Sequence, residues 1–221
     1  MKLLLNALAK YISGLLLVGA LLFLPAGGFG YSNGWLFIAL LFLPMACLGA
    51  FLFFKSPALL EKRLDVKEKA GTQRRVVAVA ALLFISGFIV AGLDFRFGWS
   101  DVSRPVVISA SILFLISYVL YAEVMRENAY LSRTIKVEKD QQVVDTGLYS
   151  VVRHPMYTTT IFLFLSIPLV LGSLWSLILF LPYIPVIAVR IISEEKLLEK
   201  ELSGYKEYKK RVKYRLFPLV W

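Results

Sequence analysis

The sequence predicts an all-α fold: a polytopic integral membrane helical bundle of about six transmembrane helices, with a cytoplasmic C-terminal helical segment. Hydrophobic residues make up 58% of the 221 positions and charged residues only 18%, which is more apolar than an ordinary globular domain. Four runs lack any charged side chain, at residues 11–54, 76–93, 105–122 and 157–189. Because a helix crosses a bilayer with about 20 mostly apolar residues, these runs are long enough to hold the spans.

The first run is too long for one helix. We expect it to divide at residues 25–34, which are rich in turn-forming residues, and to give spans near 5–25 and 35–54. The first of these could instead be a signal peptide, although no clear small-residue cleavage site follows it. The second and third runs are predicted to form one span each.

The segments outside the first four spans carry their own signals. Residues 58–66 place apolar side chains at near-helical spacing among charges, which fits either a helix on the membrane surface or a solvated loop. The last run is predicted to form two short helices joined by a turn at Gly172-Ser173. The charged tail from Glu194 is expected to be helical to about Lys213, and the aromatic end, residues 214–221, is expected to dock back on the membrane or the bundle.

The basic residues are unevenly distributed. The net charge is +10, and with both termini in the cytoplasm 23 of the 25 Lys and Arg residues fall on the cytoplasmic side. The positive-inside bias therefore predicts this topology, in a membrane that is expected to be a prokaryotic inner membrane. It also accounts for the charge, so no nucleic-acid partner is predicted. The single Cys47 excludes a disulfide framework or a cysteine metal site within one chain, and no metal is predicted.

Two polar groups flank the last uncharged run. Residues 147–157 contain the only histidine, His154, directly before Pro155 and close to Tyr157, and the second group is Arg190, Glu194 and Glu195. Proline disfavours a helical conformation in its predecessor and suits the first helical position, so His154 should cap the helix that Pro155 begins. A helical hairpin would return the chain to its starting side and bring the two groups together. Clustered polar groups at membrane depth suggest a functional pocket.

Each of these residues also has a purely structural interpretation. Histidine, tyrosine and arginine at a membrane boundary are often only interfacial anchors. Arg190 and Glu194 are four positions apart and could form a simple pair on one helix, worth about 0.2–0.5 kcal/mol.

About the last 90 residues resemble the isoprenylcysteine carboxyl methyltransferases and their relatives, the phospholipid N-methyltransferases. The resemblance rests on Gly147-Leu148-Tyr149 with residues 153–157, on residues 190–198, and on the ending from Gly204-Tyr205 to Leu216-Phe217-Pro218. It implies a membrane methyltransferase that uses S-adenosyl-L-methionine and acts on a lipidic or amphiphilic acceptor. Thr158-Thr159-Thr160 departs from the small residue common in the family, and the segment before Tyr205 is one residue shorter than in the prenylcysteine enzymes.

The resemblance also assigns roles to individual residues. The residues implied to contact the cofactor are Gln142, Val143, Val144, Tyr149, His154, Pro155, Tyr157 and Glu194. Arg190 is the arginine expected near the acceptor group of the substrate, and a guanidinium can bind a carboxylate through two hydrogen bonds. The expected catalytic residues are Arg190, Glu194 and His154. On this view residues 1–125 form a four-span region, and residues 126–221 form the catalytic region with its cofactor-binding loop, helical hairpin and cytoplasmic tail.

Several functions remain open at this point. A carboxylate acceptor needs no general base, whereas an amine acceptor must lose a proton, for which His154 or Glu194 are candidates. Membrane sterol reductases have a similar C-terminal bundle and ending but use NADPH, and the acidic sequence Ser193-Glu194-Glu195 stands where they typically have an arginine- and aspartate-rich motif. A non-catalytic membrane binding protein is the third possibility, and cofactor binding by the purified protein separates the three.

Overall fold

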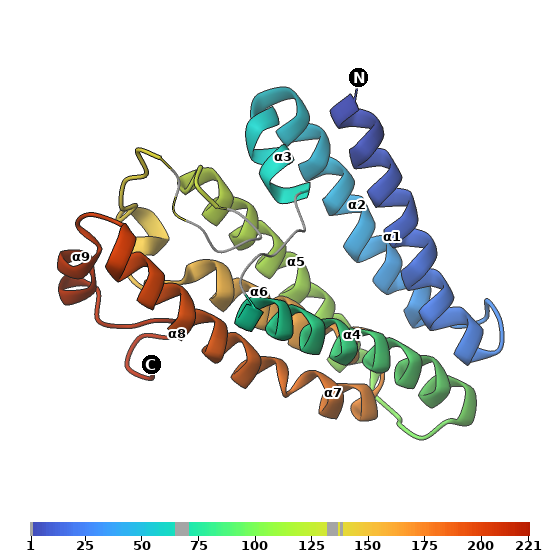
Figure 1. The fold of residues 1–221 in the computed structure, drawn as a ribbon. Coiled ribbons are helices and arrows are strands. Elements are labelled where there is room, and N and C mark those ends of the chain that lie inside the picture. The colour runs from blue at the N-terminus through green and yellow to red at the C-terminus, as the bar shows by residue number, and fades with distance from the viewer. Residues whose placement is uncertain (1, 65–70, 132–136, 138) are drawn as a thin grey trace.

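The computed structural model describes residues 2–64, 71–131, 137 and 139–221. Over these residues the chain forms helices and no strand, which confirms the predicted fold class (Figure 1). The elements are α1 (Lys2–Ala26), α2 (Ser32–Lys55), α3 (Pro57–Leu64), α4 (Gly71–Phe97), α5 (Arg104–Glu127), the short 3₁₀ helix η1 (Gly147–Ser150), α6 (Pro155–Val170), α7 (Leu174–Phe180), α8 (Tyr183–Glu201) and α9 (Tyr205–Arg211).

Within the described part of the chain, five helical segments are long and apolar enough to cross a membrane: Lys2–Ala26, Ser32–Lys55, Arg74–Phe97, Arg104–Glu127 and Leu174–Glu201. The sixth predicted pass is α6, an apolar helix of only 16 residues. At 1.5 Å per residue it is about 24 Å long, shorter than the roughly 30 Å hydrocarbon core. The protein is therefore a multi-pass membrane protein with five full-length candidate spans and one short apolar helix.

The last apolar segment is divided. Helices α7 and α8 follow one another but are separated at Leu181 and Pro182. Proline has no N–H to continue the helical hydrogen-bond ladder, which accounts for the break. The predicted turn at Gly172-Ser173 is confirmed, since it joins α6 to α7 with Gly172 at a φ of 74°.

The short amphipathic segment after α2 is helical, as one of the two interpretations predicted. Helix α3 covers Pro57–Leu64, and the predicted positions 65 and 66 lie outside the described residues. Its buried residues Leu59 and Leu60 pack against Met125 of α5.

The expectation of a continuous tail helix to Lys213 is wrong. Helix α8 ends at Glu201, Gly204 adopts a left-handed φ of 83°, and only Tyr205–Arg211 resumes as α9. Glycine adopts this conformation without the steric cost that a side chain would add, so it redirects the chain here. The expectation that the aromatic end docks back on the bundle is confirmed, because the Thr158 hydroxyl donates to the Leu216 carbonyl at 2.8 Å and Leu216 is buried beside Ile191 of α8.

The packing of the bundle leaves two distinct ends. Helix α5 packs on α6, α1 packs on α4, and α4 packs on α7. Gly92 permits the contact of α4 with α1, since a Cβ there would stand 2.5 Å from the Leu22 carbonyl oxygen. The three turns that join α1 to α2, α4 to α5 and α6 to α7 gather at one end, at the lower right of Figure 1. The C-terminal half of α8, α9 and the segment before α6 lie at the other end.

Candidate functional site

The segment before α6 is shaped by Gly147 and Glu127. Gly147 has a positive φ of 51°, and a Cβ there would lie only 1.4 Å from the Glu127 carboxylate. That carboxylate accepts a hydrogen bond from the Leu148 amide at 3.0 Å. The backbone conformation therefore favours glycine, and a side chain here would also displace the Glu127 carboxylate from the Leu148 amide. The turn positions η1 and its Tyr149 at the end of the bundle.

The start of α6 follows the prediction. His154 is the N-cap and Pro155 occupies the first turn of the helix. The tail clamps this start, because the amides of Arg153 and His154 donate to the carbonyls of Tyr214 and Arg215, each at 2.9 Å. Residues far apart in the sequence thus fix the orientation of the histidine.

The predicted meeting of the two polar groups is confirmed by the contacts between α6 and α8. The Tyr157 hydroxyl donates to Glu194 Oε2 at 2.6 Å, and it accepts a hydrogen bond from Arg190 Nε at 3.0 Å. Tyr157 is 5% exposed and Arg190 9%. One phenol therefore joins an acidic and a basic side chain from the facing helix.

Glu195, for which the sequence suggested no role, is the centre of a second buried network. Its carboxylate accepts from Arg153 Nε at 2.7 Å and Arg215 Nε at 2.9 Å, and lies 3.3 Å from His154 Nε2. The side chains of Glu195 and Arg153 are each only 3% exposed. Glu195 ties the start of α6 and the tail to α8. Its neighbour Glu194 points to Tyr157 because successive residues of a helix point about 100° apart.

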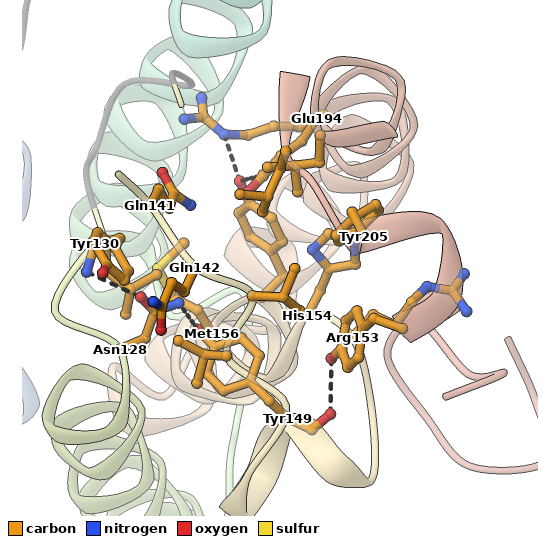
Figure 2. A pocket seen from close by; sticks show the side chains of 18 residues that line it. Asn128, Tyr130, Gln141, Gln142, Tyr149, Arg153, His154, Met156, Glu194 and Tyr205 are labelled. Carbon is orange, nitrogen blue, oxygen red and sulfur yellow. Dashed lines mark hydrogen bonds between the residues drawn. The ribbon is translucent and has the colours of Figure 1, made fainter. Parts of the chain in front are cut away.

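A pocket opens between these networks, with about 820 Å³ of empty space that is partly open to solvent. Its walls come from the end of α5, the loop before η1, the start of α6, α8 and α9. In Figure 2, Asn128, Tyr130 and Gln142 lie on one side, and Glu194, Tyr205 and His154 lie on the other. Of the predicted site residues, the pocket is lined by Gln142, Val143, Val144, Tyr149, His154, Tyr157, Arg190 and Glu194. Pro155 is not among the lining residues, because it is buried at the start of α6.

Sequence reasoning missed part of the pocket wall. The additional lining residues include Asn128, Tyr130, Met156, Leu198, Tyr205 and Tyr208. The Asn128 amide donates to the Tyr149 hydroxyl at 3.0 Å and thereby orients this ring. The only sequence signal for the tyrosines of α9 was the ending that begins at Gly204, which carried the family resemblance but no assigned role.

The tyrosine hydroxyls of the pocket differ in their partners. The Tyr149 hydroxyl accepts from Asn128, and the Tyr157 hydroxyl bonds to Glu194 and Arg190. The Tyr208 hydroxyl donates to the Tyr149 carbonyl at 2.7 Å. The hydroxyl of Tyr205 is buried and has no hydrogen-bond partner among the described residues. Burial raises the pKa of the Tyr205 phenol well above its usual value, and the Glu195 and Glu194 carboxylates raise it further.

This donor set fits a ligand that has both polar and apolar parts. A carboxylate and a guanidinium supply charged hydrogen-bonding groups, the aromatic rings and Val143, Val144 and Leu198 supply apolar surface, and Tyr205 offers a free hydroxyl. Ligand sites commonly combine mostly apolar walls with a few such polar groups.

The fold and the pocket define a class: a multi-pass helical membrane protein with a pocket lined by polar side chains at one end of its bundle. Comparison with known families shows that residues 106–204 match the phospholipid methyltransferase family. This region is similar to the membrane methyltransferases that include the phospholipid and isoprenylcysteine enzymes, and the match indicates an S-adenosylmethionine-dependent methyltransferase with a lipid substrate. No curated protein matches it. The matched residues extend from α5 to the start of α9 and support a methyltransferase rather than a nicotinamide-dependent reductase.

Proposed function

We propose that this protein transfers a methyl group from S-adenosylmethionine to the polar end of a lipidic or amphiphilic acceptor in the pocket between α6 and α8. The observation that carries the proposal is the Tyr157 hydroxyl, which bonds to both Glu194 and Arg190 at the pocket wall. Helix α8 thus presents an anion and a cation to one pocket, and both are bonded to a tyrosine of α6. A ligand with an ammonium or hydroxyl group suits the first, and an acceptor with an anionic group suits the second.

We assign Glu194, Tyr157, Tyr149, His154 and the loop residues 142–144 to holding the cofactor, with Pro155 setting the start of α6. All but Pro155 line the pocket, which supports this assignment. When bound, S-adenosylmethionine supplies an electrophilic methyl group on a positively charged sulfur.

We assign Arg190 to binding a carboxylate acceptor, so that an O-methyl ester is the favoured product. The guanidinium is buried, and its Nε is held by Tyr157, which suits a fixed recognition role. One carboxylate oxygen then forms the new bond to the methyl carbon as the bond from carbon to sulfur breaks, and no proton needs to move. The chain's task is to align the reacting groups and to exclude bulk water.

A phospholipid amine is the second candidate acceptor, and the family match favours it. An ammonium must lose a proton before it can accept a methyl group, and Glu194 is the better placed base. Both residues line the pocket, but His154 Nε2 is 3.3 Å from the buried Glu195 carboxylate, which suits a positioning role. Lipid analysis with a labelled methyl donor, in cells with and without the protein, distinguishes an ester product from a methylated amine.

We further propose that residues 126–221 form the catalytic region, and that the pocket faces the cytoplasm of a prokaryotic cell with both termini on that side. Among the residues that the structure describes, those that line the pocket lie between Asn128 and Tyr208, which supports the first point. The excess of Lys and Arg near this end supports the second. Reporter fusions at both termini test the orientation, and two periplasmic termini would contradict it.

The binding assignment is tested by calorimetry on the purified protein with S-adenosylhomocysteine. Glu194→Ala should raise Kd by roughly 10- to 150-fold, because hydrogen bonds to a charged group contribute about 1.5–3 kcal/mol. Glu199→Ala, one turn along α8 and outside the pocket, is the matched control and should leave Kd unchanged. Arg190→Ala should mainly lower turnover. An unchanged Kd in Glu194→Ala would contradict the assignment, and NADPH is expected not to bind.

A further inference from the structure

We infer that Tyr205 is a ligand contact: its hydroxyl donates a hydrogen bond to the cofactor in the pocket. The inference rests on the proposed function of this pocket and adds to it a residue that neither the family resemblance nor the sequence pattern assigned. Tyr205 lies on the pocket wall with Glu194 and His154 (Figure 2) and is only 3% exposed.

The Tyr205 hydroxyl is buried and has no hydrogen-bond partner among the described residues. Buried polar groups in folded proteins nearly always have a hydrogen-bond partner, and a buried hydroxyl without one calls for a specific explanation. Across the described residues, Tyr205 Oη is the buried side-chain atom that lacks a partner. A ligand in the pocket would supply it.

The neighbouring Tyr208 differs from Tyr205 because its hydroxyl has a partner within the fold. Tyr208 lies on the same helix and also lines the pocket, and its ring centre is 5.7 Å from that of Tyr205. Its hydroxyl donates to the Tyr149 carbonyl at 2.7 Å, so it fastens α9 to η1. Two neighbouring buried phenols therefore differ in function. The Tyr208 hydroxyl connects α9 to η1, whereas the Tyr205 hydroxyl is available to a ligand.

The position of Tyr205 is fixed by the start of α9 and by the packing of its ring. It begins α9 directly after Gly204, whose left-handed conformation sets the direction of the helix. Its ring is buried in a cluster with Leu202, Tyr208 and Val212, against which Val143 of the cofactor loop packs. A phenol fixed in this way loses little further freedom when it forms one more hydrogen bond.

The direction of the hydrogen bond follows from the charges nearby. Burial and the carboxylates of Glu195 and Glu194 raise the pKa of the Tyr205 phenol, so it stays protonated and is a donor. A protonated phenol can also accept a hydrogen bond, but the proton that it keeps is satisfied only by an acceptor on the ligand. In S-adenosylmethionine these are the carboxylate of the amino-acid end, the ribose oxygens and the ring nitrogens of adenine.

The test is the variant Tyr205→Phe, which removes one oxygen and keeps the ring. On the purified full-length protein, the Kd for S-adenosylhomocysteine should rise on the order of tenfold. The melting temperature without ligand should stay the same or increase, because the deleted oxygen has no partner in the fold. The variant should therefore lose ligand affinity without losing unliganded stability. If the Tyr205 hydroxyl had only a structural role, its removal would lower the stability as well.

Tyr31→Phe is the matched control. Tyr31 is a buried tyrosine at the opposite end of the bundle, and its hydroxyl donates to the Leu171 carbonyl at 2.6 Å. This variant should lower the unliganded melting temperature and leave Kd unchanged. The same measurements with 5′-methylthioadenosine locate the acceptor: the loss in affinity persists if the nucleoside accepts the hydrogen bond and disappears if the amino-acid end does.

A wild-type Kd in folded Tyr205→Phe overturns the inference. If this variant does not fold, a photoreactive azidophenylalanine in place of Tyr205 gives a second readout, and absence of crosslinking to radiolabelled S-adenosylhomocysteine also overturns it. The proposed function would fail differently: the wild-type protein would not bind S-adenosylhomocysteine, or Glu194→Ala would bind it normally.

Discussion

The two ends of the helical bundle both contain buried carboxylates, and we propose a ligand site at only one of them. At the end where the three turns gather, Asp94 is 2% exposed and accepts hydrogen bonds from the Ser100 amide at 2.7 Å, the Ser100 hydroxyl at 2.8 Å and the Ser173 hydroxyl at 2.5 Å. Each of these donors belongs to the turns themselves. The Asp94 network joins α4 to the start of α7.

At the opposite end the polar groups form two sets. Glu195 is enclosed by Arg153, Arg215 and His154 and resembles Asp94 in that its partners belong to the fold. Glu194 and Tyr205 line the pocket, and the Tyr205 hydroxyl has no partner among the described residues. Burial of a charge is thus a weak guide to function, and the informative feature is whether the fold itself satisfies the buried group.

The largest expected effect follows from replacing Glu195 by alanine. The change leaves the buried Arg153 guanidinium without its carboxylate partner, and breaking such a pair costs about 3–5 kcal/mol. We expect Glu195→Ala to lose its folded state or to melt at a far lower temperature in detergent, as measured by thermal unfolding and size-exclusion chromatography.

Glu199→Ala is the control for this prediction, since Glu199 is on the same helix and pairs with Lys209 at the surface. The two side chains are about one third exposed, and a solvated pair of this kind contributes about 0–1 kcal/mol, so this variant should melt close to the wild type. A stable Glu195→Ala protein that has lost only ligand binding would place Glu195 in the ligand site and remove the distinction between the two glutamates.

A smaller effect, confined to stability, is expected at the other end of the bundle. Asp94→Ala leaves the Ser100 and Ser173 hydroxyls without their acceptor, and an unsatisfied buried group costs about 1–3 kcal/mol. The melting temperature should decrease while the Kd for S-adenosylhomocysteine stays at the wild-type value. A changed Kd would show that the two ends are coupled, and the comparison would no longer hold.

The sequence predicted the parts of this structure that depend on local patterns. The uncharged residues 157–189 with their central Gly172-Ser173 were enough to bring Tyr157 next to Glu194. The dipeptide His154-Pro155 was enough to place the start of α6.

What the sequence could not provide depended on long-range packing. Tyr205 reaches the pocket because the chain turns back at Gly204, and the contact of Asn128 with Tyr149 links residues 21 positions apart. The different roles of Glu194 and Glu195 required knowing which face of α8 meets α6. Adjacent residues of the same type carry no sequence signal for that choice.

The smallest expected effect comes from Tyr157→Phe, which tests the pocket end with a single oxygen. The Tyr157 hydroxyl orients Glu194 and Arg190, so its loss should leave both side chains in place but less well fixed. We expect the Kd for S-adenosylhomocysteine to rise about 2- to 12-fold, equivalent to a net hydrogen bond of about 0.5–1.5 kcal/mol. Calorimetry beside Tyr31→Phe, which loses the same kind of hydrogen bond at the far end, gives the comparison. If both variants lost affinity equally, the effect would reflect general loosening of the bundle, whereas a loss in Tyr157→Phe alone assigns the hydroxyl to ligand binding.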